Sequence, residues 1–140
     1  MTATLCLLAT LAGRAVAIPA DLVEAVVDLG EIVPVPRTDP VIVGLATLRS
    51  RVITVLDPRP ALGAAPTPTR RAVLLRIEGH EYALLVDDCV DIAPLAVAPL
   101  PAGVALNSAW RAIADGVVER DGVPLLLITP AALVPQPLAA

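Results

Sequence analysis

Short apolar runs, each ended by a turn-forming residue, divide this chain along its whole length. Fifteen prolines and eight glycines occur among its 140 residues. A proline inside a helix removes a hydrogen bond and clashes with the preceding turn, so this spacing leaves little room for long helices. Strand-length apolar runs between Gly and Pro turns are typical of all-β barrels and sandwiches. The sequence therefore predicts an all-β fold.

The predicted strands are the apolar runs that end at a turn signal. They are Thr4–Leu11, Ala15–Ile18, Leu22–Val27, Val41–Leu45, Val52–Leu56, Ala72–Ile77, Tyr82–Val86, Cys89–Ile92, Gly116–Arg120 and Pro124–Ile128. The segments Glu78–Glu81 and Arg120–Gly122 are hairpin tips, because each carries a glycine that can take a positive φ. Helix is predicted only as short turns after Asp57, around Asn107–Arg111 and over Ala131–Val134.

The length of the chain is that of a single domain with a sizeable core. The segment Ala64–Thr69 contains Pro66 and Pro68 and is predicted to be an exposed linker between two halves. Comparable strand patterns lie on either side of it. We therefore expect one domain, residues 1–140, made of two small β-barrels that share one core.

Composition excludes several classes of function. Of the residues, 56% are hydrophobic, the net charge is −4, and the aromatics are Tyr82 and Trp110 alone. Nucleic-acid binding needs a basic surface and usually stacking aromatics, so no nucleic-acid partner is expected. The two cysteines, Cys6 and Cys89, have no disulfide-framework spacing, which fits a reducing cytosol.

The first twenty residues allow two interpretations. An apolar run is followed by small residues at Ala15 and Ala17, which is a signal-peptide feature. However, no basic residue precedes the run, and Arg14 follows it. Gly13 and Arg14 also separate two strand-like runs, as a hairpin turn would, and we favour this hairpin over the signal peptide. Later uncharged stretches are interrupted by prolines, so no membrane span and a soluble protein are expected.

Side chains that could carry chemistry do not converge. His80, the only histidine, lies at a hairpin tip, where a solvated turn residue is the simpler interpretation. The acidic cluster formed by Asp87, Asp88 and Asp91 is expected to be a polar turn and strand edge. No phosphate-binding loop or nucleophile elbow is present. We expect no catalytic residue, no metal and no cofactor.

Residue identities at fixed spacing run through nearly the whole chain. They are Ala17-Ile18-Pro19, Val23 and Ile32–Pro36; then Gly44-Leu45, Leu48-Arg49, Val52-Ile53, Val55, Asp57, Arg59 and Leu62-Gly63; then Leu84–Asp87, Cys89, Asp91, Ile92, Pro99-Leu100-Pro101, Gly116, Asp121-Gly122 and Leu125–Leu127. This pattern resembles the CheW-like domains, which couple bacterial chemoreceptors to the histidine kinase CheA. The central group, from Gly44 to Gly63, is its most specific part.

The resemblance implies a fold and a set of partners. The fold is two five-stranded SH3-like β-barrels that share a core, with short helices. The function is that of a stand-alone, cytoplasmic, non-catalytic adaptor. Its partners would be the regulatory domain of a CheA-type kinase and the cytoplasmic tip of a chemoreceptor, which would lie in the groove between the barrels. Candidate partner-binding residues are Val23, Val26, Ile32, Gly44, Leu48, Arg49 and Asp57.

Departures from the family pattern keep two alternatives open. Thr47 and Ser50 replace the family's Asn and Gly, and the family's Glu falls on Ala25, with Glu24 one place earlier. In a strand, that slip moves the carboxylate to the opposite face, away from Arg49. Arg49 is then expected on an exposed turn, as a partner contact or as plain surface charge. A divergent adaptor of a non-chemotaxis two-component pathway is the first alternative.

The second alternative is an enzyme. A small β-barrel hydrolase would use Asp87, Asp91 and His80. This alternative requires the three side chains to converge on one site.

Overall fold

The computed structural model describes residues 3–35, 40–65 and 70–134. In chain order these residues form β1 (Ala3–Leu11), β2 (Arg14–Pro19), the 3-10 helical turn η1 (Ala20–Leu22), β3 (Val23–Asp28), β4 (Val33–Pro34), β5 (Ile42–Leu48), β6 (Arg51–Leu56), β7 (Arg71–Ile77), β8 (His80–Leu85), β9 (Asp88–Ala98), α1 (Ser108–Ile113), β10 (Ala114–Arg120), β11 (Val123–Ile128) and the 3-10 helical turn η2 (Pro130–Leu133).

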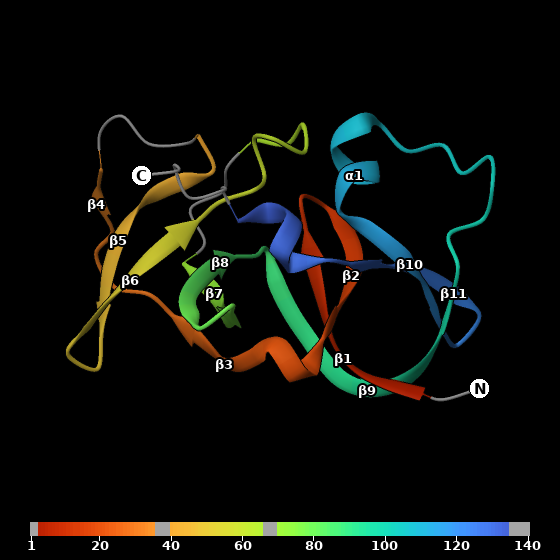
Figure 1. Ribbon diagram of the computed structural model, residues 1–140, viewed down its shortest axis with the longest axis horizontal. Coiled ribbons are helices and arrows are strands. Elements are labelled where there is room, and N and C mark those ends of the chain that lie inside the picture. Colours follow the sequence, from red (N-terminus) through yellow and green to blue (C-terminus); the bar gives the residue numbers. More distant parts are fainter. Residues whose placement is uncertain (1–2, 36–39, 66–69, 135–140) are drawn as a thin grey trace.

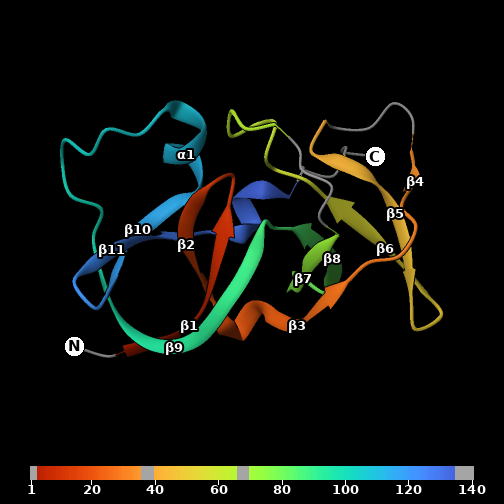
Figure 2. The same ribbon diagram turned by 180° about the vertical axis from the view of Figure 1, so that it is seen from behind.

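The strands form two sheets that lie side by side (Figures 1 and 2). One sheet is a closed barrel in the order β1-β2-β11-β10-β9, and the other has six strands in the order β3-β7-β8-β6-β5-β4. Most neighbours are antiparallel, but β2 pairs with β11, and β6 with β8, in parallel. The six-stranded sheet is therefore an insertion in the chain between β2 and β9, and the barrel is built from the two ends of the chain.

The all-β prediction is confirmed, and each predicted strand is present. The structure differs in that one sheet closes with five strands whereas the other has six. The additional strand, β4, is two residues long and contains Pro34, too short for a sequence pattern to reveal. The predicted linker, whose residues 66–69 lie outside the described residues, joins β6 to β7 within one sheet. It therefore does not mark the boundary between the two sheets.

Helix is as scarce as expected. Helix α1 begins after Asn107, whose side-chain Oδ1 accepts a hydrogen bond from the Trp110 N–H at 2.9 Å, an N-cap contact. Short turns also follow Asp57 and Thr129. Within the residues that the structure describes, no helix is long and apolar enough to cross a membrane.

The N-terminal segment is a buried hairpin, as favoured over the signal peptide. Cys6 and Leu8 on β1 point into the barrel, whereas Leu7 and Leu11 point into the core between the two sheets. Because both faces of β1 are buried, its sequence is an unbroken apolar run instead of an alternating one. Cys6 and Cys89 are both free thiols.

A shared core fills the space between the barrel and the sheet. It combines barrel residues such as Leu7 and Ile18 with sheet residues such as Val73 and Leu84. Trp110 of α1 lies in the same cluster, and the Arg14 guanidinium lies 4.9 Å from its ring centroid. Two smaller clusters fill the barrel interior and the concave face of the six-stranded sheet.

Four tight hairpin turns have both central residues at positive φ. They are Ala12-Gly13, Arg49-Ser50, Glu78-Gly79 and Asp121-Gly122. Turns of this kind match the twist of the flanking strands and favour glycine. The β5–β6 turn is the only one of these four without a glycine, and Ser50 has a φ of 68°. An L-residue pays a steric cost in this region, so the β5–β6 turn stores local strain.

Replacing Ser50→Gly should therefore stabilise the protein. The change relieves the steric cost at a positive φ, which is about 1–2 kcal/mol, and loses part of that gain to the greater freedom of glycine in the unfolded chain. We expect the thermal midpoint, followed by circular dichroism, to rise by roughly 2–4 °C. The matched control, Gly79→Ser in the β7–β8 turn, should lower it by a similar amount. An unchanged or lower midpoint for Ser50→Gly would contradict the turn geometry.

Val86, which follows β8, tests the shared core. Its side chain is fully buried in that core. Val86→Asp places an unpaired carboxylate there and should destabilise by several kcal/mol. Arg51→Ala removes an exposed ion pair and should cost less than about 1 kcal/mol. Chemical denaturation of both variants measures the difference, and the opposite ranking would overturn the assignment of faces.

Candidate functional site

The seven candidate partner-binding residues all belong to the six-stranded sheet or to its loops, but the structure does not gather them on one surface. Val23 is half-buried against the shared core. Ile32 and Leu48 are half-buried against the smaller apolar cluster on the concave face of the six-stranded sheet, which we call the concave cluster. Gly44 and Asp57 are buried. The exposed members are Val26 on β3 and Arg49 at the β5–β6 turn.

Gly44 allows two strands to approach closely. A Cβ atom at this position would lie 2.1 Å from the Val33 carbonyl oxygen of β4. No side chain fits in that space without moving backbone. The close packing of β4 against β5 therefore explains the glycine at this position, and no partner contact is needed to explain it.

Asp57 belongs to a buried ionic cluster. Its carboxylate accepts hydrogen bonds from the Arg59 side chain, with Nε–Oδ1 2.8 Å and Nη2–Oδ2 3.0 Å. Arg59 is 1% exposed, and its Nη1 lies 3.7 Å from Asp87 Oδ1. The hydrogen bond with Asp57 raises the pKa of the Arg59 guanidinium, against the effect of desolvation. Because a buried charge needs a partner, Asp57 has a structural role in the fold.

Asp87 connects this cluster to the barrel. Its Oδ2 accepts a hydrogen bond from the Gly13 N–H at 2.8 Å, and its own N–H donates to the Thr10 carbonyl at 2.8 Å. Asp87 lies between β8 of the sheet and β9 of the barrel. One carboxylate thus contacts Arg59 from the sheet and the β1–β2 hairpin from the barrel.

A ladder of four charged side chains crosses the six-stranded sheet near the β5–β6 and β7–β8 turns. Arg51 of β6 donates two hydrogen bonds to Glu81 of β8, one of them from Nη2 to Oε2 at 3.2 Å. Arg76 of β7 lies 3.8 Å from Glu81 and donates from Nε to Glu24 Oε1 of β3 at 2.6 Å. We call Glu24, Arg76, Glu81 and Arg51 the charge ladder.

The displaced acid near the family's Glu position is part of this ladder. The β3–β7 register shifts between Val23 and Ala25, which leaves Glu24 as the additional residue of a bulge. The hydrogen bond from Arg76 lowers the pKa of the Glu24 carboxyl. The expected move to the opposite face does not occur, because the bulge lets Glu24 pair with Arg76, which is on the same face of β7 as Leu74, the residue opposite Ala25. Arg49 has no ion-pair partner among the residues that the structure describes.

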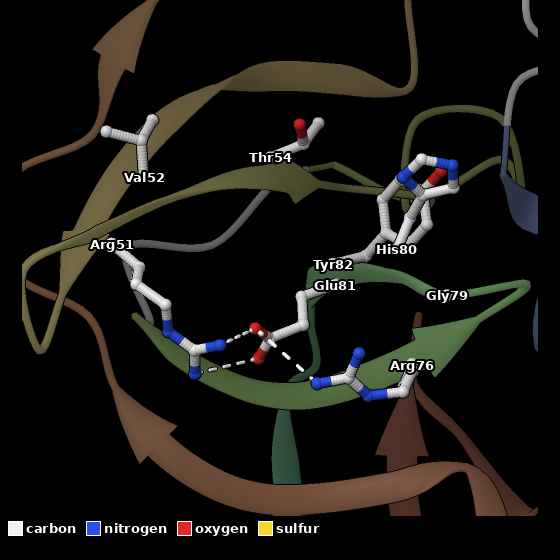
Figure 3. Close-up of a pocket in the computed structure, with 8 residues that line it drawn as sticks. All are labelled: Arg51, Val52, Thr54, Arg76, Gly79, His80, Glu81 and Tyr82. Atoms are coloured by element: carbon white, nitrogen blue, oxygen red, sulfur yellow. Dashed lines mark hydrogen bonds and ion pairs between the residues drawn. The ribbon is translucent and has the colours of Figure 1, made fainter.

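A hollow of about 360 Å³ opens beside the ladder, between the first residues of β6 and β8 (Figure 3). Val52 and Thr54 of β6 line one side, and His80 and Tyr82 of β8 line the other. Figure 3 shows Glu81 between the two guanidinium groups of the ladder. The hollow is open and mostly polar, unlike the enclosed apolar pockets that hold small ligands.

Exposed aliphatic side chains lie along the margin of the shared core. Val26 of β3 pairs with buried Val73, and Ile92 of β9 pairs with buried Leu7, so Val26 and Ile92 are on the faces turned toward that core. Leu5 is on the same face of β1 as Leu7. Leu5, Val26 and Ile92 are nonetheless exposed. We call these three residues the junction strip.

Near the junction strip, Arg71 of β7 contacts one strand of each sheet. Its side chain donates to Asp28 of β3 at 2.9 Å and lies 3.5 Å from Asp88 of β9. The hydrogen bond with Asp28 raises the pKa of the Arg71 guanidinium. Arg71 therefore links β3, at the edge of the six-stranded sheet, to β9 of the closed barrel by exposed ion pairs.

The acidic cluster seen in the sequence is dispersed. Asp87 contacts Gly13 and Arg59, and Asp88 contacts Arg71. Asp91 accepts a hydrogen bond from Arg120 at 2.8 Å, and its pKa is lowered by the Ile92 backbone N–H and by that arginine.

His80 lines the hollow and so lies on the six-stranded sheet, away from these strand edges. In the described parts of the chain no three His, Cys, Asp or Glu side chains are placed to hold a metal ion.

Sequence reasoning expected Arg49 on an exposed turn, where the structure has it, but missed the buried cluster and the charge ladder. The Asp57–Arg59 pair had a signal, because the two residues are close in sequence and both match the family pattern. Two of the ladder's three contacts had none, since they join residues 30 and 52 positions apart, whereas Arg76 and Glu81 face each other across the predicted β7–β8 hairpin. Those two contacts follow from strand register, which the sequence does not state.

Comparison with known proteins places this fold in a family. The model of the CheW-like domain matches residues 5–137 of the chain. A crystal structure of the scaffolding protein TtCheW from Thermoanaerobacter tengcongensis is similar, with a TM-score of 0.77 and 23% sequence identity, over 92% of this chain and 90% of that chain. No curated protein sequence matches the chain. Because the family model spans nearly the whole length, the chain belongs to the CheW-like domain family.

Proposed function

We propose that this protein is a non-catalytic, cytoplasmic adaptor that couples chemoreceptors to a CheA-type histidine kinase, with the whole chain acting as one domain. Membership of the CheW-like family supports the proposal, and the similar TtCheW is a scaffolding protein. The observation that carries it is the junction strip, three exposed aliphatic side chains on the faces of β1, β3 and β9 that turn toward the shared core.

The junction strip has the chemistry of a site for a helical partner. Leu5, Val26 and Ile92 extend the shared core to the surface, where a folded monomer has no internal use for them. An amphipathic helix with an apolar stripe buries such a surface. We propose that the receptor tip binds to the junction strip.

The β5–β6 turn supplies a second surface with a different character. Arg49 is exposed without an ion-pair partner in the described chain, and nearby Val52 is 68% exposed. A cation beside an apolar side chain is a common form of protein contact, since arginine combines charge with a planar apolar face. We propose that the kinase regulatory domain binds to the β5–β6 turn.

An enzymatic function gains no support from the placement of its candidate residues. His80 lines the hollow on the six-stranded sheet, whereas Asp87 contacts the barrel hairpin and Asp91 contacts Arg120. A general acid–base pair must meet at one reacting centre. We therefore infer that the protein does not catalyse a reaction.

The divergent adaptor keeps one specific observation in its favour. The resemblance implies that the family's Glu can pair with the Arg that matches Arg49; here Glu24 pairs with Arg76 instead, and Arg49 has no ion-pair partner in the described part of the chain. Binding assays against the CheA-type kinase and against other histidine kinases of the same host separate the two adaptors. Binding to a non-chemotaxis kinase alone would favour the divergent one.

Arg49→Glu tests the assigned kinase contact. An exposed arginine contributes little to folding, so the melting temperature should change by less than about 2 °C. Charge reversal in an interface costs ~2–5 kcal/mol, so the dissociation constant for the kinase regulatory domain, measured by calorimetry, should rise by at least about 30-fold.

The matched control for this experiment is Arg111→Glu, an exposed arginine on α1 of the barrel. It should leave binding unchanged. If Arg49→Glu unfolds the protein, Arg49 is paired internally. If it folds and binds normally, the kinase contact lies elsewhere.

A further inference from the structure

The β5–β6 hairpin extends beyond the point where the neighbouring strand supports it. β6 pairs with β5 as far as Leu48↔Arg51, next to the turn. Its recorded pairing with β8 begins only at Thr54↔Tyr82. Between these points β6 and β8 separate, and the 360 Å³ hollow occupies the gap (Figure 3). The turn that carries Arg49 therefore projects past the backbone ladder that holds the rest of β6.

Two side-chain contacts attach this projecting end to the sheet, among the residues that the structure describes. Leu48 is half-buried against the concave cluster. Arg51, its partner in the register, donates both guanidinium Nη groups to the Glu81 carboxylate. The side chain of Glu81 is 13% exposed and that of Arg51 is 53% exposed. The glutamate is the fixed member of the pair, and the arginine reaches to it from the hairpin.

Glu81 is itself held in place from the other side. Arg76 of β7 lies 3.8 Å from it and is in turn hydrogen-bonded to Glu24 of β3 at 2.6 Å. The carboxylate thus lies between two guanidinium groups, which limits its rotamers (Figure 3). A bidentate arginine–carboxylate contact is more directional than a single ion pair. The charge ladder consequently attaches the end of the β5–β6 hairpin to β8, β7 and β3 of the sheet.

We infer that Glu81 is a positioning residue, which fixes the β5–β6 turn so that Arg49 is presented in one orientation. The inference rests on the proposed role of Arg49. The turn has two residues at positive φ and no glycine, so its geometry needs support from neighbouring contacts. A preorganised contact loses less conformational entropy when a partner binds, and therefore binds more tightly. Glu81 does not touch the partner in this scheme.

Hydrogen exchange in the isolated chain tests the anchoring step. Glu81→Gln removes the charge and one acceptor oxygen, and the amides of residues 47–53 should exchange faster than in the unaltered protein. Arg51→Ala should produce the same change, and the double variant should add little to it, because both substitutions break one contact. The matched control is Asp91→Asn, which breaks an exposed ion pair on the barrel and should leave residues 47–53 unchanged. Exchange that stays unaltered in Glu81→Gln would overturn the inference.

Binding to the kinase regulatory domain tests the positioning step. Glu81→Gln should raise the dissociation constant by about threefold to tenfold. In an Arg49→Ala background the same substitution should have no effect, because there is no longer a guanidinium to position. A merely structural role for Glu81 would give equal losses in both backgrounds and would refute the inference.

The two hypotheses fail in different ways. One outcome is that hydrogen exchange is faster in Glu81→Gln, but the unaltered protein binds neither the kinase domain nor the receptor tip. The proposed function is then overturned, and so is the inference that Glu81 positions Arg49 for a partner. If the protein binds and Arg49→Glu weakens binding, while Glu81→Gln changes neither exchange nor affinity, the proposed function stands and the positioning role of Glu81 is overturned.

Discussion

The shared apolar core is the constraint on which the rest of this structure depends. A sheet that faces water on one side needs apolar residues at alternate positions only, whereas β1, β7 and β8 have buried residues on both faces. The barrel and the six-stranded sheet each supply one wall of this core, so neither can bury its own strands alone. The high hydrophobic content of the chain and the close contact of the two sheets have this single cause.

Polar contacts at the junction set the relative orientation that apolar packing leaves undetermined. Asp87 joins Arg59 of the sheet to the β1–β2 hairpin, and Arg71 joins the edges of β3 and β9. Ionic contacts of this kind are directional, and the buried ones tolerate little rearrangement because an unpaired buried charge is costly. The buried contacts of Arg59 with Asp57 and Asp87 therefore contribute most to this orientation, and the exposed pairs of Arg71 contribute little. The hairpin with Arg49 is supported differently, by exposed charges at the outer end of the sheet.

The fold was predictable from sequence where local signals determine it. Strand-length runs located the ten long strands, and glycines located most of the turns, because each signal acts within a few residues. Strand β4 was not predicted, because two residues are too few to show an alternating pattern. The six-stranded sheet could not be distinguished from a barrel, because closure depends on strand register. The family resemblance gave both Arg49 and Asp57 as candidate partner-binding residues. In the structure Arg49 is exposed, whereas Asp57 is buried and pairs with Arg59. The contact between Glu81 and Arg51 depends on the parallel alignment of β6 with β8, which no local pattern encodes.

The insertion of the sheet between β2 and β9 has a consequence for how the chain folds. Leu7 pairs with Ile92, and Val16 with Leu126, so the barrel closes through contacts between distant parts of the chain. Bringing such segments together costs loop-closure entropy before any contact compensates for it, and domains dominated by distant pairings fold in roughly milliseconds to seconds. The hairpins of the inserted sheet are local and can form first, which shortens the effective loop between β2 and β9. We therefore expect the pairings of β1 with β9 and of β2 with β11 to form after the local hairpins of both sheets.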